Sequence, residues 1–380
     1  MPRACRSSRS TASAIIRRWN RPTRSAISST PISSAIDDPR LSDPPAGAAQ
    51  PMRTAFRIVA IAALVVLVAC LAWFIPAKMG AFATDRQAMV ARYASPPSRF
   101  VTVDGVPMHV RIEGQGPPVL MLHGTGVNLH EWDPLAERMR GRFTVVRMDW
   151  PPYGLSGPID PKGYSTARAA QLVGLTLDKL GYDKLAVVAT SNGSNIALQL
   201  NANKPERITA MAFSILPLER PSQTRKVDWR IKRMAAFNDA WLRDYHPRWF
   251  YRLAFKDTSH PGWQPPEFLS QMMYDMSNLP GAIGRQKQYL ASNVVLFKTT
   301  DVGAIAEKVR VPVLLQWCAQ DTVISQGAGA SVKRFTNTHV DLIEYPNVGH
   351  WPMWEIPDRF AADIMRFLDA NPAAAGTAKP

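Results

Sequence analysis

The apolar residues follow three different patterns along the chain. Residues 58–75, IVAIAALVVLVACLAWFI, form one uninterrupted apolar run. After residue 100, short apolar runs alternate with longer segments whose apolar residues recur every three or four positions, the periodicity of an amphipathic helix. Between residues 217 and 305 this alternation stops, and Trp, Met, Arg and Pro become frequent. The pattern therefore predicts an apolar segment, an alternating domain, and an insertion within that domain.

The alternating domain is predicted to be of the α/β class. Residues 100–103 and 106–112 flank Asp104-Gly105, a dipeptide typical of tight hairpin turns. Further strands are expected at 118–122, 143–149, 185–190, 208–216, 311–318 and 340–345, and helices near 131–140, 165–180, 192–203, 326–336 and 351–369. Buried strands alternating with helices predict a mostly parallel, eight-stranded sheet with helices on both faces.

These segments define the expected domain organisation. The chain is predicted to contain a disordered basic segment (1–57), a membrane helix (58–77), a linker (78–99), an α/β core (100–216 and 306–370), a helical lid (217–305) and a disordered tail (371–380). The first 51 residues are rich in Arg, Ser, Pro and Ala and contain few large apolar residues, a composition typical of disorder. Met52 is an alternative start, in which case residues 1–51 would not be translated.

The apolar segment has three membrane interpretations. As a helix, residues 58–75 would be roughly 27 Å long, close to the thickness of a bilayer core. The segment could remain as a signal anchor, be cleaved after the small residues of Ala81–Ala83, or form a lipobox ending at a lipidated Cys70. Its length favours the anchor. Within twenty residues of the segment the basic residues balance on its two sides, so it is the arginines farther upstream, if translated, that predict a cytoplasmic N-terminus and a large domain outside the cytoplasm.

Charge and cysteine content exclude other classes. The 380 residues include 45 Lys and Arg against 30 Asp and Glu, and ten of the arginines lie in residues 1–57. The remaining basic residues are interspersed with acidic ones and form no stripe with aromatics, so a nucleic-acid partner is not expected. Cys5, Cys70 and Cys318 are scattered and predict neither a disulfide framework nor a zinc site.

The strongest chemical signal is the string Ala189-Thr190-Ser191-Asn192-Gly193, between a predicted strand and a predicted helix. A sharp strand-to-helix turn presents one side chain above the sheet and requires small residues two positions before and after it, here Ala189 and Gly193. Ser191 would also lie at a helix N-terminus, where free N–H groups favour negative charge. We identify Ser191 as the candidate nucleophile.

Two residues that follow the last predicted strands could activate this serine. His350 follows the final strand, and Gly349 before it suits a mobile imidazole. Asp321 follows the seventh strand, where a carboxylate could orient His350 and stabilise its protonated form. Glu219, just past the sixth strand, is a reserve candidate for the acid.

With these residues the chain resembles the α/β-hydrolase-fold serine hydrolases. The order Ser191, Asp321, His350 is the order of that family. The resemblance spans about residues 100–370 and includes His123-Gly124, the string DWPPYGLS at 149–156 and the pattern His-x-Pro-x-x-Glu-x-Pro at 350–357. Three positions depart from the family pattern: Ala189 and Pro152 replace glycines, and Gln320-Asp321-Thr322 replaces an Asp-Pro form.

The resemblance implies acyl-enzyme chemistry that needs no metal or organic cofactor. His350 would take the proton of Ser191, and backbone N–H groups of Thr125 and Asn192 would stabilise the oxyanion. His123 is expected to be a structural residue of its loop.

The expected substrate is a carboxylic ester with a hydrophobic part, because the Trp, Met and Phe side chains of the lid are typical of apolar pockets. A serine at the elbow argues against haloalkane dehalogenases and epoxide hydrolases, which carry aspartate there. Carbon–carbon bond hydrolases, cofactor-free haloperoxidase-like enzymes and a non-catalytic binding protein on the same scaffold remain alternatives. The sequence does not indicate the oligomeric state.

Overall fold

The computed structural model describes residues 49–159, 163–219, 227–324 and 327–372. The predicted tail falls almost entirely outside these ranges, as do residues 1–48 of the predicted disordered segment. The chain separates into two compact units, Met1–Val65 and Val66–Pro380, which are described individually.

Helix α1 (Ala49–Lys78) contains the apolar segment and extends beyond both of its predicted ends. Residues 49–57, expected to be disordered, form its first turns. Residues Met52–Lys78 are long and apolar enough to span a membrane, and the large apolar side chains between Ile58 and Leu71 are exposed. Exposure of apolar side chains on every face is typical of a helix that crosses a bilayer.

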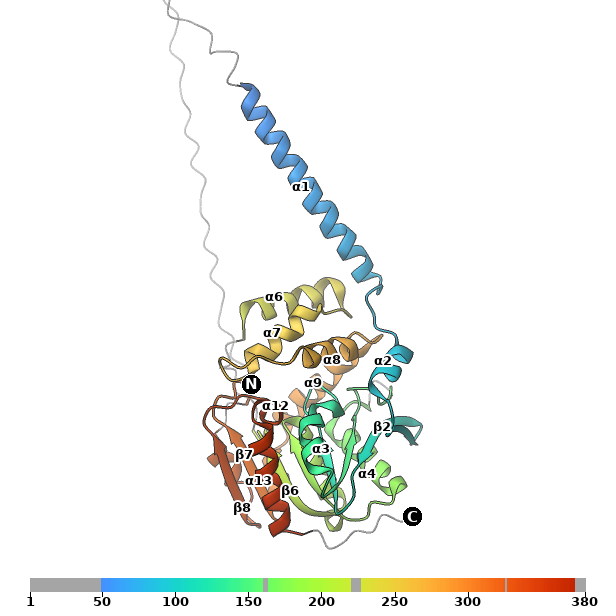
Figure 1. The fold of residues 1–380 in the computed structure, drawn as a ribbon, viewed down its shortest axis with the longest axis vertical. Helices are drawn as coiled ribbons and strands as arrows, with labels where there is room; N and C mark the ends of the chain where they lie inside the picture. The colour runs from blue at the N-terminus through green and yellow to red at the C-terminus, as the bar shows by residue number, and fades with distance from the viewer. Residues whose placement is uncertain (1–48, 160–162, 220–226, 325–326, 373–380) are drawn as a thin grey trace, which may run out of the picture. The chain divides into compact units, whose positions relative to one another are not determined.

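The second unit is built on one eight-stranded sheet, as the sequence predicts (Figure 1). Its strand order is β1-β2-β4-β3-β5-β6-β7-β8; β1 and β2 are antiparallel to their neighbours and the other pairs are parallel. The strands are β1 (Ser98–Val103), β2 (Val106–Glu113), β3 (Pro118–Leu122), β4 (Thr144–Met148), β5 (Leu185–Thr190), β6 (Ile208–Ser214), β7 (Val313–Cys318) and β8 (Val340–Tyr345). The predicted turn joins β1 to β2 through Asp104 and Gly105, both with positive φ.

Helices cover both faces of the sheet because successive strand residues point to opposite sides. On β3, Val119 and Met121 pack with α3 (Asp133–Met139) and α13 (Pro357–Ala370). Leu120 and Leu122 pack on the other face, with α4 (Thr166–Leu180) and α5 (Asn192–Asn203). All residues of β3 are buried and apolar, as expected for a central strand that is covered on both faces. Two short helices, α10 (Gly303–Ala306) and α11 (Ala328–Val332), complete the domain.

Between β6 and α10, the described residues of the insert form a series of helices and a π-helical turn, η4. These are α6 (Trp229–Phe237), η4 (Asn238–Leu242), α7 (Arg248–Thr258), α8 (Glu267–Ser277) and α9 (Ala282–Thr299). Figure 1 shows α6, α7 and α8 grouped at one end of the sheet.

Two further predicted segments differ from the structure in the elements they contain, and the helix expected near 326–336 is described only as the short α11. The linker 78–99 contains a helix, α2 (Arg86–Tyr93), because Asp85 caps it and its residues Met89 and Tyr93 are buried in the core. The single helix expected at 351–369 is two helices, α12 (Pro352–Glu355) and α13, since Pro357 lacks the N–H group that would continue the first one.

Candidate active site

Ser191 lies on the sharp turn that joins β5 to α5. Its backbone has φ 48° and ψ −131°, a conformation that non-glycine residues rarely adopt. The turn brings α5 against the end of β3, so a Cβ atom at Gly193 would lie 2.5 Å from the carbonyl oxygens of Leu122 and His123. Ala189 is fully buried. The close approach at position 193 and the burial at position 189 are therefore steric reasons for small residues there, as the sequence predicts.

His350 pairs with Asp321 through a 2.8 Å contact between Nδ1 and Oδ2. The Asp321 side chain is buried, and its Oδ1 accepts hydrogen bonds from the backbone N–H groups of Val323 and Ile324. These bonds fix the position of the carboxylate. Because the carboxylate contacts Nδ1 of His350, it also fixes the orientation of the imidazole, whose other ring nitrogen is Nε2. Glu219, the reserve acid, is exposed and lies near Arg334.

Close packing, and not the expected mobility of the imidazole, explains why position 349 is a glycine. A Cβ atom there would lie 2.4 Å from the backbone nitrogen of His260, so glycine permits close packing against the segment after α7. The backbone N–H of His350 donates to the carbonyl of Thr258 at 2.8 Å. Glu355, the acidic residue of the His-x-Pro-x-x-Glu-x-Pro pattern, accepts hydrogen bonds from the N–H groups of Gly349 and His260. The insert thus holds the histidine loop in place.

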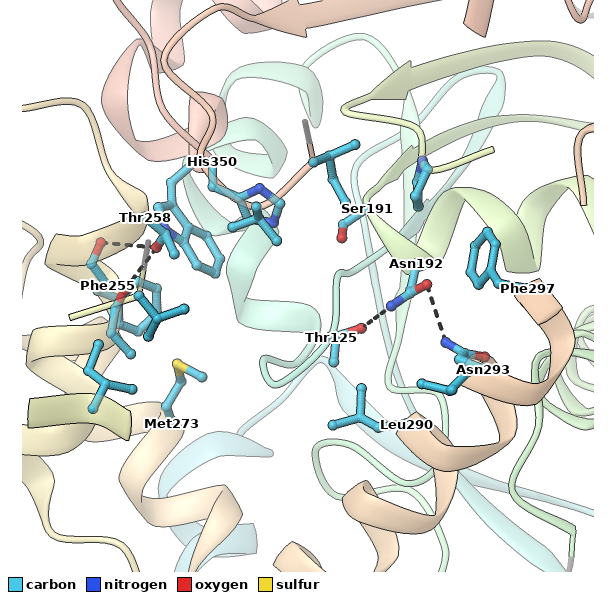
Figure 2. Close-up of a pocket in the computed structure, with 18 residues that line it drawn as sticks. Thr125, Ser191, Asn192, Phe255, Thr258, Met273, Leu290, Asn293, Phe297 and His350 are labelled. Carbon is cyan, nitrogen blue, oxygen red and sulfur yellow. Dashed lines mark hydrogen bonds between the residues drawn. The ribbon is translucent and has the colours of Figure 1, made fainter. Parts of the chain in front are cut away.

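The two residues expected to form the oxyanion hole are joined by their side chains (Figure 2). Asn192 Nδ2 donates to Thr125 Oγ1 at 2.6 Å. Asn293, on α9 of the insert, donates to Asn192 Oδ1 at 3.3 Å and accepts from Thr166 Oγ1 at 3.0 Å. Asn293 is not among the residues predicted from the sequence, because an asparagine inside a helix of irregular composition carries no distinguishing pattern.

A buried carboxyl group lies behind the loop that carries Thr125. Glu131 is 1% exposed, and its Oε2 accepts a 2.7 Å hydrogen bond from the N–H of Gly124. Burial raises the pKa of Glu131 from 4.5 to about 7, although the Gly124 N–H and the nearby His350 lower it. Sequence analysis missed this residue too, since an acidic residue at the start of a predicted helix is ordinary.

His123 has the structural place expected of it. The ring is fully buried and stacks on Trp150 with centroids 5.0 Å apart. Burial lowers the pKa of His123 to about 4, so the ring is neutral at physiological pH.

Ser191 and His350 face the same cavity, which has a volume of about 630 Å³ (Figure 2). Thr125, Asn192 and Asn293 also border it. Its remaining lining is mainly apolar and includes Val227, Ile231, Phe255, Met273, Leu290, Val294, Phe297, Val323, Ile324 and Trp351. The volume and the few polar groups at one end are typical of a small-molecule site.

The fold and this cavity define a hydrolase scaffold, and the chain belongs to the α/β hydrolase fold family, which it matches over residues 117–357. Among curated relatives, it is 23% identical to a pimeloyl-[acyl-carrier protein] methyl ester esterase of Nitrosomonas europaea, with 67% of this chain and 97% of that protein covered. It is 25% identical to a 2-hydroxy-6-oxononadienedioate/2-hydroxy-6-oxononatrienedioate hydrolase of Dechloromonas aromatica, with 66% and 86% covered.

The fold is also similar to solved structures. One is described as a membrane phospholipase A and bacterial virulence factor, with a TM-score of 0.59 and 20% identity over 82% of this chain and 97% of that chain. At this level of identity the likeness supports the fold and not a particular substrate.

Proposed function

We propose that this protein is a serine hydrolase of carboxylic esters that carry a hydrophobic part. The observation that carries the proposal is the cavity itself: a serine on a strained elbow and a histidine paired with a buried aspartate border one apolar space. The methyl ester esterase among the relatives supports the same reaction class.

In the proposed mechanism, Nε2 of His350 takes the hydroxyl proton as Ser191 Oγ attacks the ester carbonyl. The backbone N–H groups of Asn192 and Thr125 stabilise the oxyanion, and Asp321 stabilises the protonated His350. His350 then protonates the departing alcohol, which leaves an acyl-Ser191. Water attacks this acyl group as His350 takes one of its protons, and His350 returns that proton to Ser191 Oγ as the acid leaves.

Labelling with a fluorophosphonate probe tests the nucleophile directly. Ser191→Ala should abolish labelling and lower turnover of p-nitrophenyl esters by at least about a thousandfold, because the attacking oxygen is lost. Asp321→Asn should lower turnover by on the order of a thousandfold, because the imidazole loses its partner, whereas Glu219→Gln should leave it unchanged.

Each alternative gives a different result in this experiment. Retained labelling of Ser191→Ala would show that another residue is the nucleophile. A steep loss in Glu219→Gln alone would make Glu219 the acid. A labelled wild-type protein that hydrolyses no ester of any chain length would favour a carbon–carbon bond hydrolase or a haloperoxidase-like enzyme. A protein that is never labelled would favour a binding function.

We further propose that α1 is a signal anchor, which places the hydrolase domain outside the cytoplasm. Its length, composition and exposed apolar residues support this, and the arginines that precede residue 58 favour an N-terminus inside the cell. Extraction of membranes with carbonate and with detergent tests the anchor, since an integral protein is released only by detergent.

A further inference from the structure

The outward side of α6 and η4 exposes aromatic side chains that contribute little to the core. Trp229 is 63% exposed, Trp241 55% and Phe237 39%. A group of large exposed apolar residues marks an interaction site. Tryptophan in particular is enriched where a protein meets the membrane–water interface, because one end of its ring system is apolar and the other is polar.

Basic residues lie among these aromatics. Lys232 and Arg233 are exposed on the same helix, and the Arg233 guanidinium lies 5.2 Å from the ring centroid of Trp229. The acidic residues of the segment, Asp228 and Asp239, are neutralised by ion pairs with Arg230 and Lys287. The surface is therefore apolar and positively charged, a combination that suits anionic lipid head groups.

The last turns of the apolar helix contact this same surface. Phe74 lies 6.2 Å from Phe237 and 6.4 Å from Trp241, measured between ring centroids, and Trp73 lies 6.1 Å from Tyr245. Trp73 and Phe74 lie near the end of the apolar run, so in a membrane-spanning α1 they lie close to the boundary of the hydrocarbon. Their partners on the insert lie at nearly the same depth.

The inner side of α6 faces the candidate active site. Ile231 lines the cavity together with Leu290 and Val294, which are 44% and 50% exposed. One short helix thus separates the cavity from the aromatic and basic surface.

We propose that this surface, the α6 face (Trp229, Lys232, Arg233, Phe237 and Trp241), rests in the head-group layer of an anionic phospholipid bilayer, the one that α1 spans. The proposal rests on the proposed anchor and not on the esterase activity. It makes the bilayer the source from which apolar substrates reach the cavity.

The test uses the full chain reconstituted into vesicles of phosphatidylcholine and phosphatidylglycerol whose acyl chains are brominated near the head group. Bromine quenches tryptophan fluorescence only at short range. Trp229→Phe/Trp241→Phe should lower the fraction of emission that the lipid quenches, because two lipid-exposed reporters are removed. Trp317→Phe, which replaces a tryptophan of β7 that is only 7% exposed, should raise this fraction slightly, because it removes only emission that the lipid does not reach.

Charge is tested separately with Lys232→Gln/Arg233→Gln. In phosphatidylglycerol vesicles, the equilibrium constant for docking of the α6 face should fall about fivefold for each basic residue removed. In pure phosphatidylcholine it should not change. Leu342→Ser, at an exposed position of β8, is the matched surface control. All variants are compared by circular dichroism, so that a loss of fold is recognised.

Flotation of the vesicles distinguishes the two ways of failing. If the chain floats with the vesicles and Trp229→Phe/Trp241→Phe is quenched as strongly as the wild type, the α6 face does not meet lipid and the proposal is wrong. If the chain does not float, the anchor is wrong and the proposal falls with it. Neither result depends on catalysis, so the proposed hydrolase activity stands or fails on the labelling experiment.

Discussion

At the scale of single residues, Glu131 imposes a pH dependence on stability. Its pKa is raised from 4.5 to about 7 in the folded chain, mainly by burial, so the folded protein favours the protonated carboxyl group. A carboxyl group with a raised pKa contributes most stability below about pH 4.5 and loses that contribution as the pH rises through about 7. Ionisation of this buried group therefore costs folding free energy at neutral and alkaline pH.

Glu131→Gln should remove this cost while keeping an acceptor for the N–H of Gly124. Relative to the wild type, the variant should gain on the order of 3 kcal/mol between pH 4.5 and pH 8, with most of the gain below pH 7. The change in melting temperature of the two proteins, measured side by side across this range, checks the prediction. A difference that stays constant with pH would show that Glu131 does not titrate there.

At the scale of elements, α9 of the insert is tied to the end of β5 through side chains. Asn293 bonds Asn192, which bonds Thr125, and both latter residues are the proposed oxyanion donors. Asn293→Ala leaves those backbone N–H groups in place but removes the hydrogen bond that helps to position Asn192. We expect a fall of about tenfold in kcat with little change in KM, less than the roughly hundredfold loss typical when a donor is removed.

Steady-state kinetics with a p-nitrophenyl ester check this expectation. Gln286→Ala is the matched control, because Gln286 lies on the same helix and bonds Ser277 instead. A rise in KM at constant kcat would mean that Asn293 shapes the pocket without supporting the oxyanion donors.

The elements also show what sequence reasoning can and cannot reach. Strands β3, β5 and β8 begin and end at the predicted residues, since short apolar runs bounded by loops have little freedom to shift. The sequence predicts a linker where α2 lies, because only two residues of this helix are buried and its amphipathic pattern is short. Within the insert the sequence places no individual helix, because Trp, Met, Arg and Pro interrupt the alternation that marks the elements of the core.

The candidate site divides in the same way. Ser191, Asp321 and His350 could be proposed because each sits at a fixed place relative to a strand end, which the chain order reveals. Glu131 and Asn293 could not be proposed in this way. Glu131 stands out because it is buried, and Asn293 because it bonds Asn192, which lies 101 residues away in the chain. Such relations exist only once the chain is folded.

At the scale of the whole molecule, α1 should account for most of the membrane attachment. A chain shortened to begin at Ala83 retains α2, the sheet and the insert, and it loses the apolar run. It should stay in the supernatant of a high-speed spin without detergent, whereas the chain beginning at Met52 should sediment with membranes. The shortened chain should still bind anionic vesicles weakly and release them as salt is raised.

Sedimentation without membranes would contradict this prediction. It would show that the surface uncovered by removing Phe74 and Phe82 from Tyr245 is enough to cause association. Addition of salt distinguishes the two forms of binding, since apolar association is not weakened by it.

The insert between β6 and β7 is one continuous segment of the chain, and this has a consequence for the evolution of the protein. The residues proposed for bond cleavage lie outside 217–305, while the cavity wall and the α6 face lie largely inside it. Recombination between relatives can therefore exchange the whole segment as a unit and alter the substrate range while leaving the reaction intact. The exchange is constrained where the segment meets the site: the backbone carbonyl of residue 258 must still accept from the N–H of His350, and position 293 must keep an amide. A transplanted segment that keeps both should give a working chimera. One that keeps the first but lacks the amide should lose about tenfold in kcat, as expected for Asn293→Ala.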